Sequence, residues 1–130
     1  MSLFNFFGKD DNKDNASSNM DWNALTDIKQ LDEITEESNG NPILIFKHST
    51  RCSISRFALK QFESEFNLEG SIKPYFLDLL MYRDISNEIA DRFGVQHQSP
   101  QVILIKNGNA IYNASHQDIE AGRLDALVSN

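Results

Sequence analysis

The sequence predicts an α/β domain of three layers, in which helices cover both faces of a mixed β-sheet. Two apolar runs, at 43–46 and 102–105, carry this prediction, because continuous runs with β-branched residues are typical of strands buried on both faces. Segments with helical apolar spacing alternate with the strands, which favours parallel pairing. A hairpin near the C-terminus adds antiparallel strands. The expected order is β-α-β-α-β-α-β-β-α.

The chain of 130 residues suits one domain with one hydrophobic core. Its segment 8–20 is polar and charged and contains few apolar side chains. A segment of this composition cannot bury enough apolar surface to fold. We therefore expect a disordered N-terminal tail at 1–20 and a folded domain at 21–130.

The folded domain is expected to start with a strand, a helix and a second strand. A short strand at 21–25 leads into a helix that begins after Thr26, a favourable N-cap, and continues to Gly40. The turn-forming segment 39–42 then precedes the buried strand at 43–47. The apolar residues at helical spacing in the first helix are Ile28, Leu31 and Ile34.

The middle of the domain is expected to contain a helix, a strand and another helix. A strand at 72–79 includes Pro74, which indicates a bulge or imperfect pairing. The helix after it, over 85–94, ends at Gly94, a favourable C-cap. The helix before the strand is predicted from Cys52 onward by apolar residues four positions apart, which are Ile54, Ala58, Phe62 and Phe66.

The last elements are a β-hairpin and a helix. The dipeptide 107–108 is Asn-Gly, the strongest short hairpin signal, and it separates apolar strands at 101–106 and 110–112. A final helix is expected over 118–128, where apolar residues again recur at helical spacing.

Charge and composition exclude several classes of protein. The net charge is -7 and there is no cluster of Lys and Arg, which argues against nucleic-acid or anionic-membrane partners. No apolar run approaches the ~20 residues that cross a bilayer, and the apolar N-terminus is too short for a secretory signal. We therefore expect a cytoplasmic protein. Its single cysteine excludes an intramolecular disulfide and a metal site built of cysteines alone.

That cysteine, Cys52, is the strongest candidate for chemistry. It follows the strand at 43–47 and starts the next helix, at the sheet edge where open α/β sheets bind ligands. The unpaired N–H groups of the first turn and the helix dipole favour a thiolate over a thiol. Arg51 and Arg56 are placed to add positive potential, and the Ser55 hydroxyl to donate to the sulfur.

A second candidate element is Ser99-Pro100, which opens the strand at 101–106. An X-Pro bond indicates a turn or a cis peptide, and it leaves the preceding residue free to pair with another chain. If this strand runs antiparallel to 43–47, Pro100 lies at the same sheet edge as Cys52.

These residues resemble the thioredoxin superfamily, and most closely its YtxJ-like family of monothiol bacilliredoxins. The matching segments are Lys47-His48-Ser49, Arg51-Cys52-Ser53-Ile54-Ser55 and His97-Gln98-Ser99-Pro100, and Ser55 stands where dithiol relatives have a second cysteine. The chain departs from the family's usual pattern at Arg51, where Thr is common, and at Ser53, which replaces Pro.

The resemblance implies a thioredoxin-like fold and an enzyme that removes bacillithiol, a low-molecular-weight thiol, from mixed disulfides on proteins. Cys52 would be the nucleophile, and the small thiol a co-substrate rather than a bound cofactor. Substrate binding would fall to Arg51, Ser53, Ile54, Ser55, Ser99 and Pro100.

Three other interpretations remain open at this point. The fold is also compatible with a non-catalytic adaptor, or with an iron–sulfur cluster carrier of the monothiol glutaredoxin type, whose C-G-F-S motif Ser53 and Ile54 do not match. A mixed Cys/His metal site would need His48, His97 and His116 to meet near Cys52, although no fixed ligand spacing is present and we expect no metal. In the third, His116 and Asp118 hold the tail of a small thiol at the start of the last helix.

Overall fold

The computed structural model describes residues 20–128, which form a mixed five-stranded sheet in the order β1-β3-β2-β4-β5. β1, β2 and β3 run parallel, whereas β4 is antiparallel to β2 and β5 is antiparallel to β4. The tail predicted at 1–20 lies outside the described residues, apart from Met20. The strands are β1 (Asn23–Ala24), β2 (Ile43–His48), β3 (Lys73–Asp78), β4 (Gln101–Lys106) and β5 (Asn109–Ser115).

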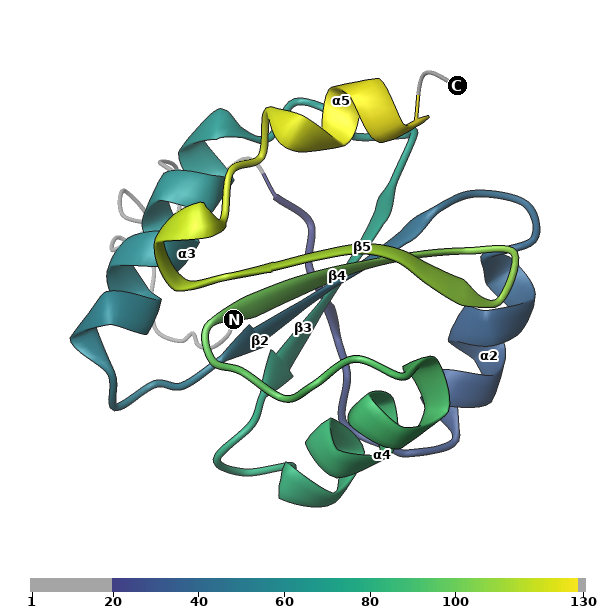
Figure 1. Ribbon diagram of the computed structural model, residues 1–130, viewed down its shortest axis with the longest axis horizontal. Coiled ribbons are helices and arrows are strands. Elements are labelled where there is room, and N and C mark those ends of the chain that lie inside the picture. Colours follow the sequence, from purple (N-terminus) through teal and green to yellow (C-terminus); the bar gives the residue numbers. More distant parts are fainter. Residues whose placement is uncertain (1–19, 129–130) are drawn as a thin grey trace.

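Helices cover both faces of this sheet, as Figure 1 shows. One face packs against α2 (Gln30–Glu37) and α4 (Arg83–Phe93), and the other against α3 (Ser53–Glu65) and α5 (Arg123–Val128). The three-layer α/β/α architecture, the mixed sheet and the element order predicted from the sequence are therefore confirmed.

The core is split by the sheet because successive strand residues point to opposite faces. On β2, Ile43 and Ile45 join the cluster under α2 and α4, whereas Leu44 and Phe46 join the cluster under α3 and α5. Phe46 packs against Phe62 of α3, with ring centroids 5.6 Å apart. The two apolar sides explain why β2 reads as a continuous hydrophobic run.

Helix α2 begins at Gln30, three residues later than the sequence predicts. The Gln30 side-chain oxygen accepts the backbone N–H groups of Thr26 and Asp27 at 2.8 and 2.9 Å, which holds this segment as a turn before the helix. Ile28 is therefore 40% exposed and not part of the core. The prediction that Thr26 is the N-cap of this helix was wrong, because Lys29 occupies that position.

Pro74 lies in a regular part of the sheet, so the predicted bulge was wrong. Leu44 pairs with Pro74 in an unbroken parallel register between β2 and β3. The Pro74 carbonyl accepts the side-chain amide of Asn23 at 3.0 Å, on the β1 side. Since the N–H and C=O of one strand residue point to the same side, the N–H that proline lacks would face β1, which starts pairing only at Tyr75.

The single helix predicted at 118–128 is two shorter elements. A 3₁₀ turn, η1 (His116–Asp118), is followed by an extended residue, Ile119, and α5 begins only at Arg123. Ile119 and Ala121 are buried in the cluster under α3 and α5. The extended backbone turns the Ile119 side chain inward, which interrupts the helix.

The turn between β4 and β5 is held by the end of α2. Asn107 and Gly108 both have positive φ, 52° and 78°, which is the conformation of a type I′ hairpin turn. The Asn107 N–H donates to the backbone carbonyl of Ser38 at 2.8 Å, and the Gly108 N–H donates to the Ser38 hydroxyl at 2.8 Å. The predicted hairpin is confirmed, with this additional clasp.

Gly94 ends α4 in the left-handed conformation, with φ 64°, as the sequence predicts. A Cβ at this position would meet no other side chain or backbone of residues 20–128 within 4 Å, so substitution costs only backbone strain. Gly94→Ala should therefore lower the free energy of unfolding by about 1 kcal/mol in urea denaturation. Gly122→Ala is the matched control, since Gly122 is equally open without a left-handed backbone, and should change stability by less than about 0.5 kcal/mol. An equal loss in both variants would contradict this account.

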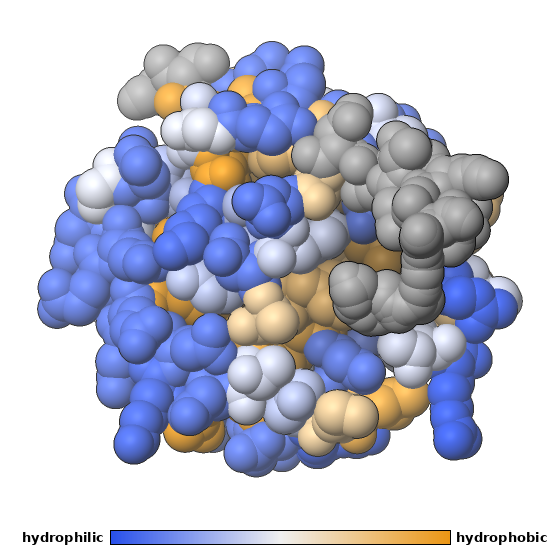
Figure 2. All heavy atoms as spheres, turned by 180° about the vertical axis from the view of Figure 1, so that it is seen from behind, coloured by the Kyte–Doolittle hydropathy of each residue, from blue (hydrophilic) through white to orange (hydrophobic). Residues whose placement is uncertain are grey.

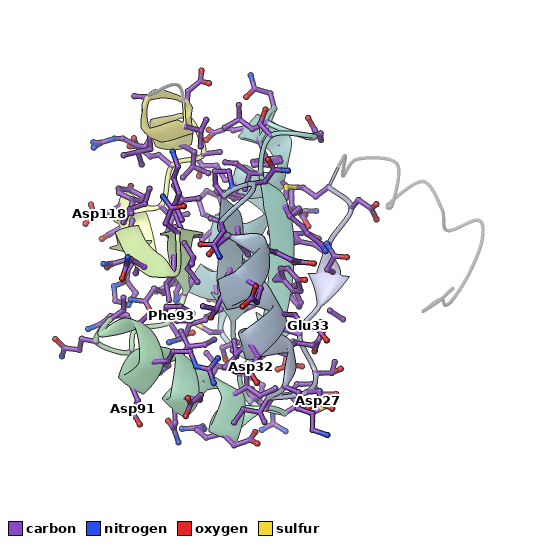
Figure 3. The ribbon with its side chains drawn as sticks, turned by 90° about the vertical axis from the view of Figure 1, so that its right-hand side faces the viewer. Asp27, Asp32, Glu33, Asp91, Phe93 and Asp118 are labelled. Atoms are coloured by element: carbon purple, nitrogen blue, oxygen red, sulfur yellow. The ribbon has the colours of Figure 1, made fainter. Side chains whose placement is uncertain are left out.

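The surface is largely hydrophilic. Figure 2 shows hydrophobic side chains gathered in a smaller central area of the rear face. Figure 3 labels three acidic side chains at this surface, Asp27 in the turn before α2 and Asp32 and Glu33 in its first turn. Arg92 of α4 bridges Asp32 at 2.9 Å. Among residues 20–128, no helix has the length and apolar character needed to cross a bilayer.

Candidate functional site

Cys52 is the N-cap of α3, one residue before the helix begins. Its backbone is extended (φ -108°, ψ 122°), and the residue is partly exposed. Its N–H donates to the Ser49 carbonyl at 3.2 Å, and its own carbonyl accepts the Arg56 N–H at 3.1 Å. The side chain forms no capping hydrogen bond, so the unpaired N–H groups of the first helical turn remain available to stabilise negative charge nearby.

Ser55 faces the strand rather than the sulfur. Its hydroxyl is fully buried, lies 2.7 Å from Nδ1 of His48 and accepts the Ser49 N–H at 3.1 Å. The predicted hydrogen bond from Ser55 to the sulfur of Cys52 is absent among the described residues. Ser55 instead ties the first turn of α3 to the end of β2, which fixes the loop that carries Cys52.

His48 is the last residue of β2. Its ring is buried between aromatic neighbours, 5.4 Å from the Phe76 ring and 6.4 Å from the Phe46 ring. Burial lowers the pKa of His48, Asp78 opposes this and Arg56 adds to it. The His48 imidazole is therefore neutral and holds the Ser55 hydroxyl through the contact at Nδ1. The ring has a structural role in the site.

The segment that precedes β4 lies at the same edge of the sheet. The Ser99-Pro100 peptide bond is cis, and antiparallel pairing places Gln101 opposite Lys47 of β2. The prediction that Pro100 and Cys52 share one sheet edge is therefore confirmed. The Ser99 hydroxyl oxygen is buried and has no hydrogen-bond partner among residues 20–128.

The side chain of Gln101 organises this segment, which we call the proline loop (residues 96–100). Its amide nitrogen donates to the Gln96 carbonyl at 3.0 Å, and its oxygen accepts the Gln98 N–H at 3.4 Å. The proline loop is thus held by a buried glutamine that sequence reasoning did not single out.

Lys47 is the second residue that sequence reasoning missed. It is 0% exposed, and its Nζ lies 2.7 Å from Nδ1 of His97 and donates to Oε1 of Gln101 at 3.1 Å. Burial lowers the pKa of Lys47 to about 8. The available signal was a lysine that directly continues the apolar run 43–46 inside a doubly covered strand.

The remaining predicted residues around Cys52 lie on the surface. Arg51, Ser53 and Ile54 are exposed around Cys52, and Arg51 forms no ion pair within the described part of the chain. The Arg56 guanidinium donates to the Thr50 carbonyl at 3.1 Å and so braces the loop before Cys52.

The first turns of α3 present apolar surface to solvent. Ile54 is 59% exposed and Phe57 is 71% exposed, so Ile54 does not belong to the buried stripe that its spacing suggested. The buried face of α3 starts instead at Ser55 and continues to Phe62. A groove of about 410 Å³ lies on this part of α3, lined by His48, Arg56, Phe57, Leu59 and Lys60.

η1 adjoins the site from the other side. The His116 N–H donates to the Pro100 carbonyl at 3.1 Å, and η1 packs against α3. His116 adopts a left-handed backbone with φ 55°. Both His116 and Asp118 are exposed, and Figure 3 labels Asp118 at the surface. The structure therefore brings the start of the last helical region next to the proline loop.

The three histidines do not combine with Cys52 into a metal site. His48 forms a hydrogen bond with Ser55, and His97 forms one with Lys47. His116 is exposed on η1. Within residues 20–128, no three His, Cys, Asp or Glu side chains are grouped so that they could hold a metal ion.

Both the sequence and the fold of this chain resemble those of known proteins. Residues 23–124 match the sequence family described as monothiol bacilliredoxin BrxC. A solved structure described as a proposed oxidoreductase with a thioredoxin fold is 34% identical, covers 82% of this chain and 92% of its own, and superimposes with a TM-score of 0.69.

More distant solved structures share the fold alone. Thioredoxin from Malassezia sympodialis is 18% identical with a TM-score of 0.63, covering 86% of this chain and 91% of its own. Thioredoxin from Fasciola hepatica is 18% identical with a TM-score of 0.59, covering 82% and 95%. These similarities confirm the thioredoxin-like architecture.

Proposed function

This chain belongs to the monothiol bacilliredoxin family BrxC, and we propose that it removes a low-molecular-weight thiol of the bacillithiol type from mixed disulfides on proteins. The reaction class is thiol–disulfide exchange by a monothiol oxidoreductase, which the family and the single cysteine support together. One observation carries the proposal. Cys52 is a partly exposed helix N-cap at the same sheet edge as a proline loop.

In the first proposed step, the Cys52 thiolate attacks the sulfur of the small thiol in a protein mixed disulfide. A new disulfide forms between Cys52 and the small thiol, the old disulfide breaks, and the protein substrate leaves as a thiolate. The first-turn N–H groups of α3 and the nearby Arg51 stabilise the attacking anion.

In the second step, another thiol from solution attacks the small-thiol sulfur in the Cys52 adduct. Cys52 leaves as a thiolate, and the small thiol departs joined to the attacking solution thiol as a disulfide. Ser55 cannot take the role of a resolving group because it is a buried hydroxyl bonded to the end of β2. Regeneration of Cys52 therefore depends on a thiol from solution.

The protein substrate would lie across the exposed surface around Cys52. Ile54 and Phe57 offer apolar contact, and Ser53 lies exposed between Cys52 and Ile54. We expect the backbone of Ser99, which lies two residues before β4, to pair with the chain that carries the mixed disulfide. The proposed setting is the cytoplasm, where low-molecular-weight thiols keep cysteines reduced.

Transfer of the small thiol is the direct test. The full chain is mixed with a protein that carries one bacillithiol in mixed disulfide, and intact mass spectrometry follows both partners. We expect the mass of one small thiol to move to this chain, and peptide analysis to locate it on Cys52. A glutathione mixed disulfide, run in parallel, measures the preference between small thiols.

Two outcomes would contradict the proposal. If the substrate protein keeps its small thiol while Cys52 remains unmodified at neutral pH, this chain does not perform the exchange. If Cys52 instead forms a stable disulfide with the substrate protein itself and no small thiol is transferred, the attack falls on the other sulfur. Heat-denatured chain serves as the control for uncatalysed transfer.

A further inference from the structure

Among residues 20–128, Lys47 is a buried cation that has no carboxylate partner. Its side chain is 0% exposed, and among the described residues its Nζ contacts only Nδ1 of His97 and Oε1 of Gln101. A buried ammonium is costly unless hydrogen bonds compensate for the lost water. Both compensating groups belong to the proline loop or to the residue directly after it.

The contact with His97 has a defined direction. An ammonium has three donors and no acceptor, so at 2.7 Å Nδ1 of His97 must be the acceptor and must carry no proton. The Ser86 hydroxyl, 3.3 Å from the same Nδ1, is placed to donate as well. Partial burial, Lys47 and Arg83 all lower the pKa of His97, which favours a neutral ring. The one ring proton then resides on Nε2.

We propose that Lys47 is a positioning residue that fixes His97 as its Nε2–H tautomer and so presents a hydrogen-bond donor beside Ser99 and Pro100. The inference rests on the proposed exchange function. His97 is exposed, and its Nε2 has no partner among residues 20–128, so the donor points to a surface that a substrate can reach.

The Nε2–H of His97 would donate to an oxygen acceptor on the incoming mixed disulfide. Such an acceptor is a backbone carbonyl or a carboxylate. Lys47 reaches this position from β2 and also holds Gln101, whose side chain binds the loop backbone at Gln96 and Gln98. One buried lysine therefore sets both the shape of the proline loop and the proton position on its exposed histidine.

The first test uses the wild-type chain alone. Long-range ¹H–¹⁵N NMR spectra of the imidazole rings at pH 7 distinguish the two neutral tautomers. We expect His97 to show a bare Nδ1 and a protonated Nε2. A proton on Nδ1, or on both nitrogens, would overturn the proposal without any activity measurement.

The second test replaces the ammonium with an apolar side chain of similar length, Lys47→Met. We expect His97 to lose its single tautomer, and kcat/KM for removal of the small thiol to fall about three- to tenfold, the effect of one hydrogen bond. Alkylation of Cys52 by iodoacetamide, which does not use the proline loop, should change less than twofold. Lys106→Met is the control, because it makes the same charge change at the other end of β4, away from the proline loop.

The outcomes separate this inference from the proposed function. An unchanged kcat/KM in Lys47→Met, or an equal fall in kcat/KM and in alkylation rate, would overturn the positioning role. An equal fall in Lys106→Met would mean that net charge is responsible, and would overturn it too. Lack of exchange activity in the wild-type chain would refute the proposed function, while the tautomer in that same sample still decides whether Lys47 fixes His97.

Discussion

Replacing Cys52 with serine is expected to abolish thiol–disulfide exchange. A serine hydroxyl is not ionised at neutral pH and does not attack a disulfide, so the rate should fall by at least about 10³-fold, to the uncatalysed background. The measurement is release of a fluorescently labelled small thiol from a protein mixed disulfide. Because Cys52 is partly exposed at the N-cap and makes no side-chain capping bond, the variant should unfold at nearly the wild-type temperature.

Ser64→Ala, on the same helix, is the matched control for this variant. The Ser64 hydroxyl donates to the Gln61 carbonyl on an exposed face of α3, and its loss should leave the exchange rate within about twofold of the wild type. Exchange at an undiminished rate in Cys52→Ser would mean that another group performs the chemistry, and the mechanism given above would be wrong.

Ser55→Cys should convert the one-thiol cycle into a two-thiol cycle. The N-cap and N3 side chains of a helix lie close together, as the capping box shows, and Cys52 and Ser55 occupy these positions. The new thiol at position 55 would attack the Cys52 sulfur of the adduct, release the small thiol and leave an internal disulfide. Without added thiol, the adduct should decay at least about 100-fold faster than in the wild type, because the attack is intramolecular.

The adduct is followed by mass spectrometry after removal of free thiol. Ser55→Ala is the control and should keep a long-lived adduct, although loss of the contacts with His48 and Ser49 should cost about 1–3 kcal/mol of stability. An adduct of equal lifetime in Ser55→Cys and in the wild type would show that position 55 is not within reach of the sulfur.

The sheet and the location of the chemistry were predictable because they depend on strong local signals. Continuous apolar runs identified β2 and β4, and the Asn-Gly dipeptide fixed the turn between β4 and β5. Antiparallel pairing of β2 with β4 then brings Cys52 and Pro100 to one edge. These features follow from periodicity and turn chemistry, which act within a few residues.

The errors arose where particular contacts, local or tertiary, overrode the helical spacing of apolar residues. Ile54 fits the helical spacing of α3, but it lies in the first turn of the helix and its side chain is exposed to solvent. Gln30 closes a turn on Thr26 that helix propensity does not reveal. Ile119 leaves the helical conformation to bury its side chain. The packing of Ile119 involves distant parts of the chain that no short window of sequence contains, whereas the bond between Gln30 and Thr26 spans only four residues and competes locally with the helical pattern.

The supporting residues of the site were the least predictable part. The bonds from Lys47 to His97 and to Gln101 join residues 50 and 54 positions apart. A buried polar network of this kind depends on the pairing of β2 with β4, and so becomes visible only when the fold is known. The bond between His48 and Ser55, in contrast, spans seven residues, but sequence spacing pointed Ser55 toward the sulfur instead.

The clasp formed by Ser38 has a consequence for how the molecule opens. It joins α2 to the hairpin of β4 and β5 at the end of the sheet opposite Cys52, through two hydrogen bonds to a residue that is 1% exposed. Local unfolding usually proceeds in cooperative blocks of neighbouring elements. The amides of α2 and of this hairpin should therefore exchange with solvent together, as one such block, while the loop that carries the sulfur fluctuates independently of it.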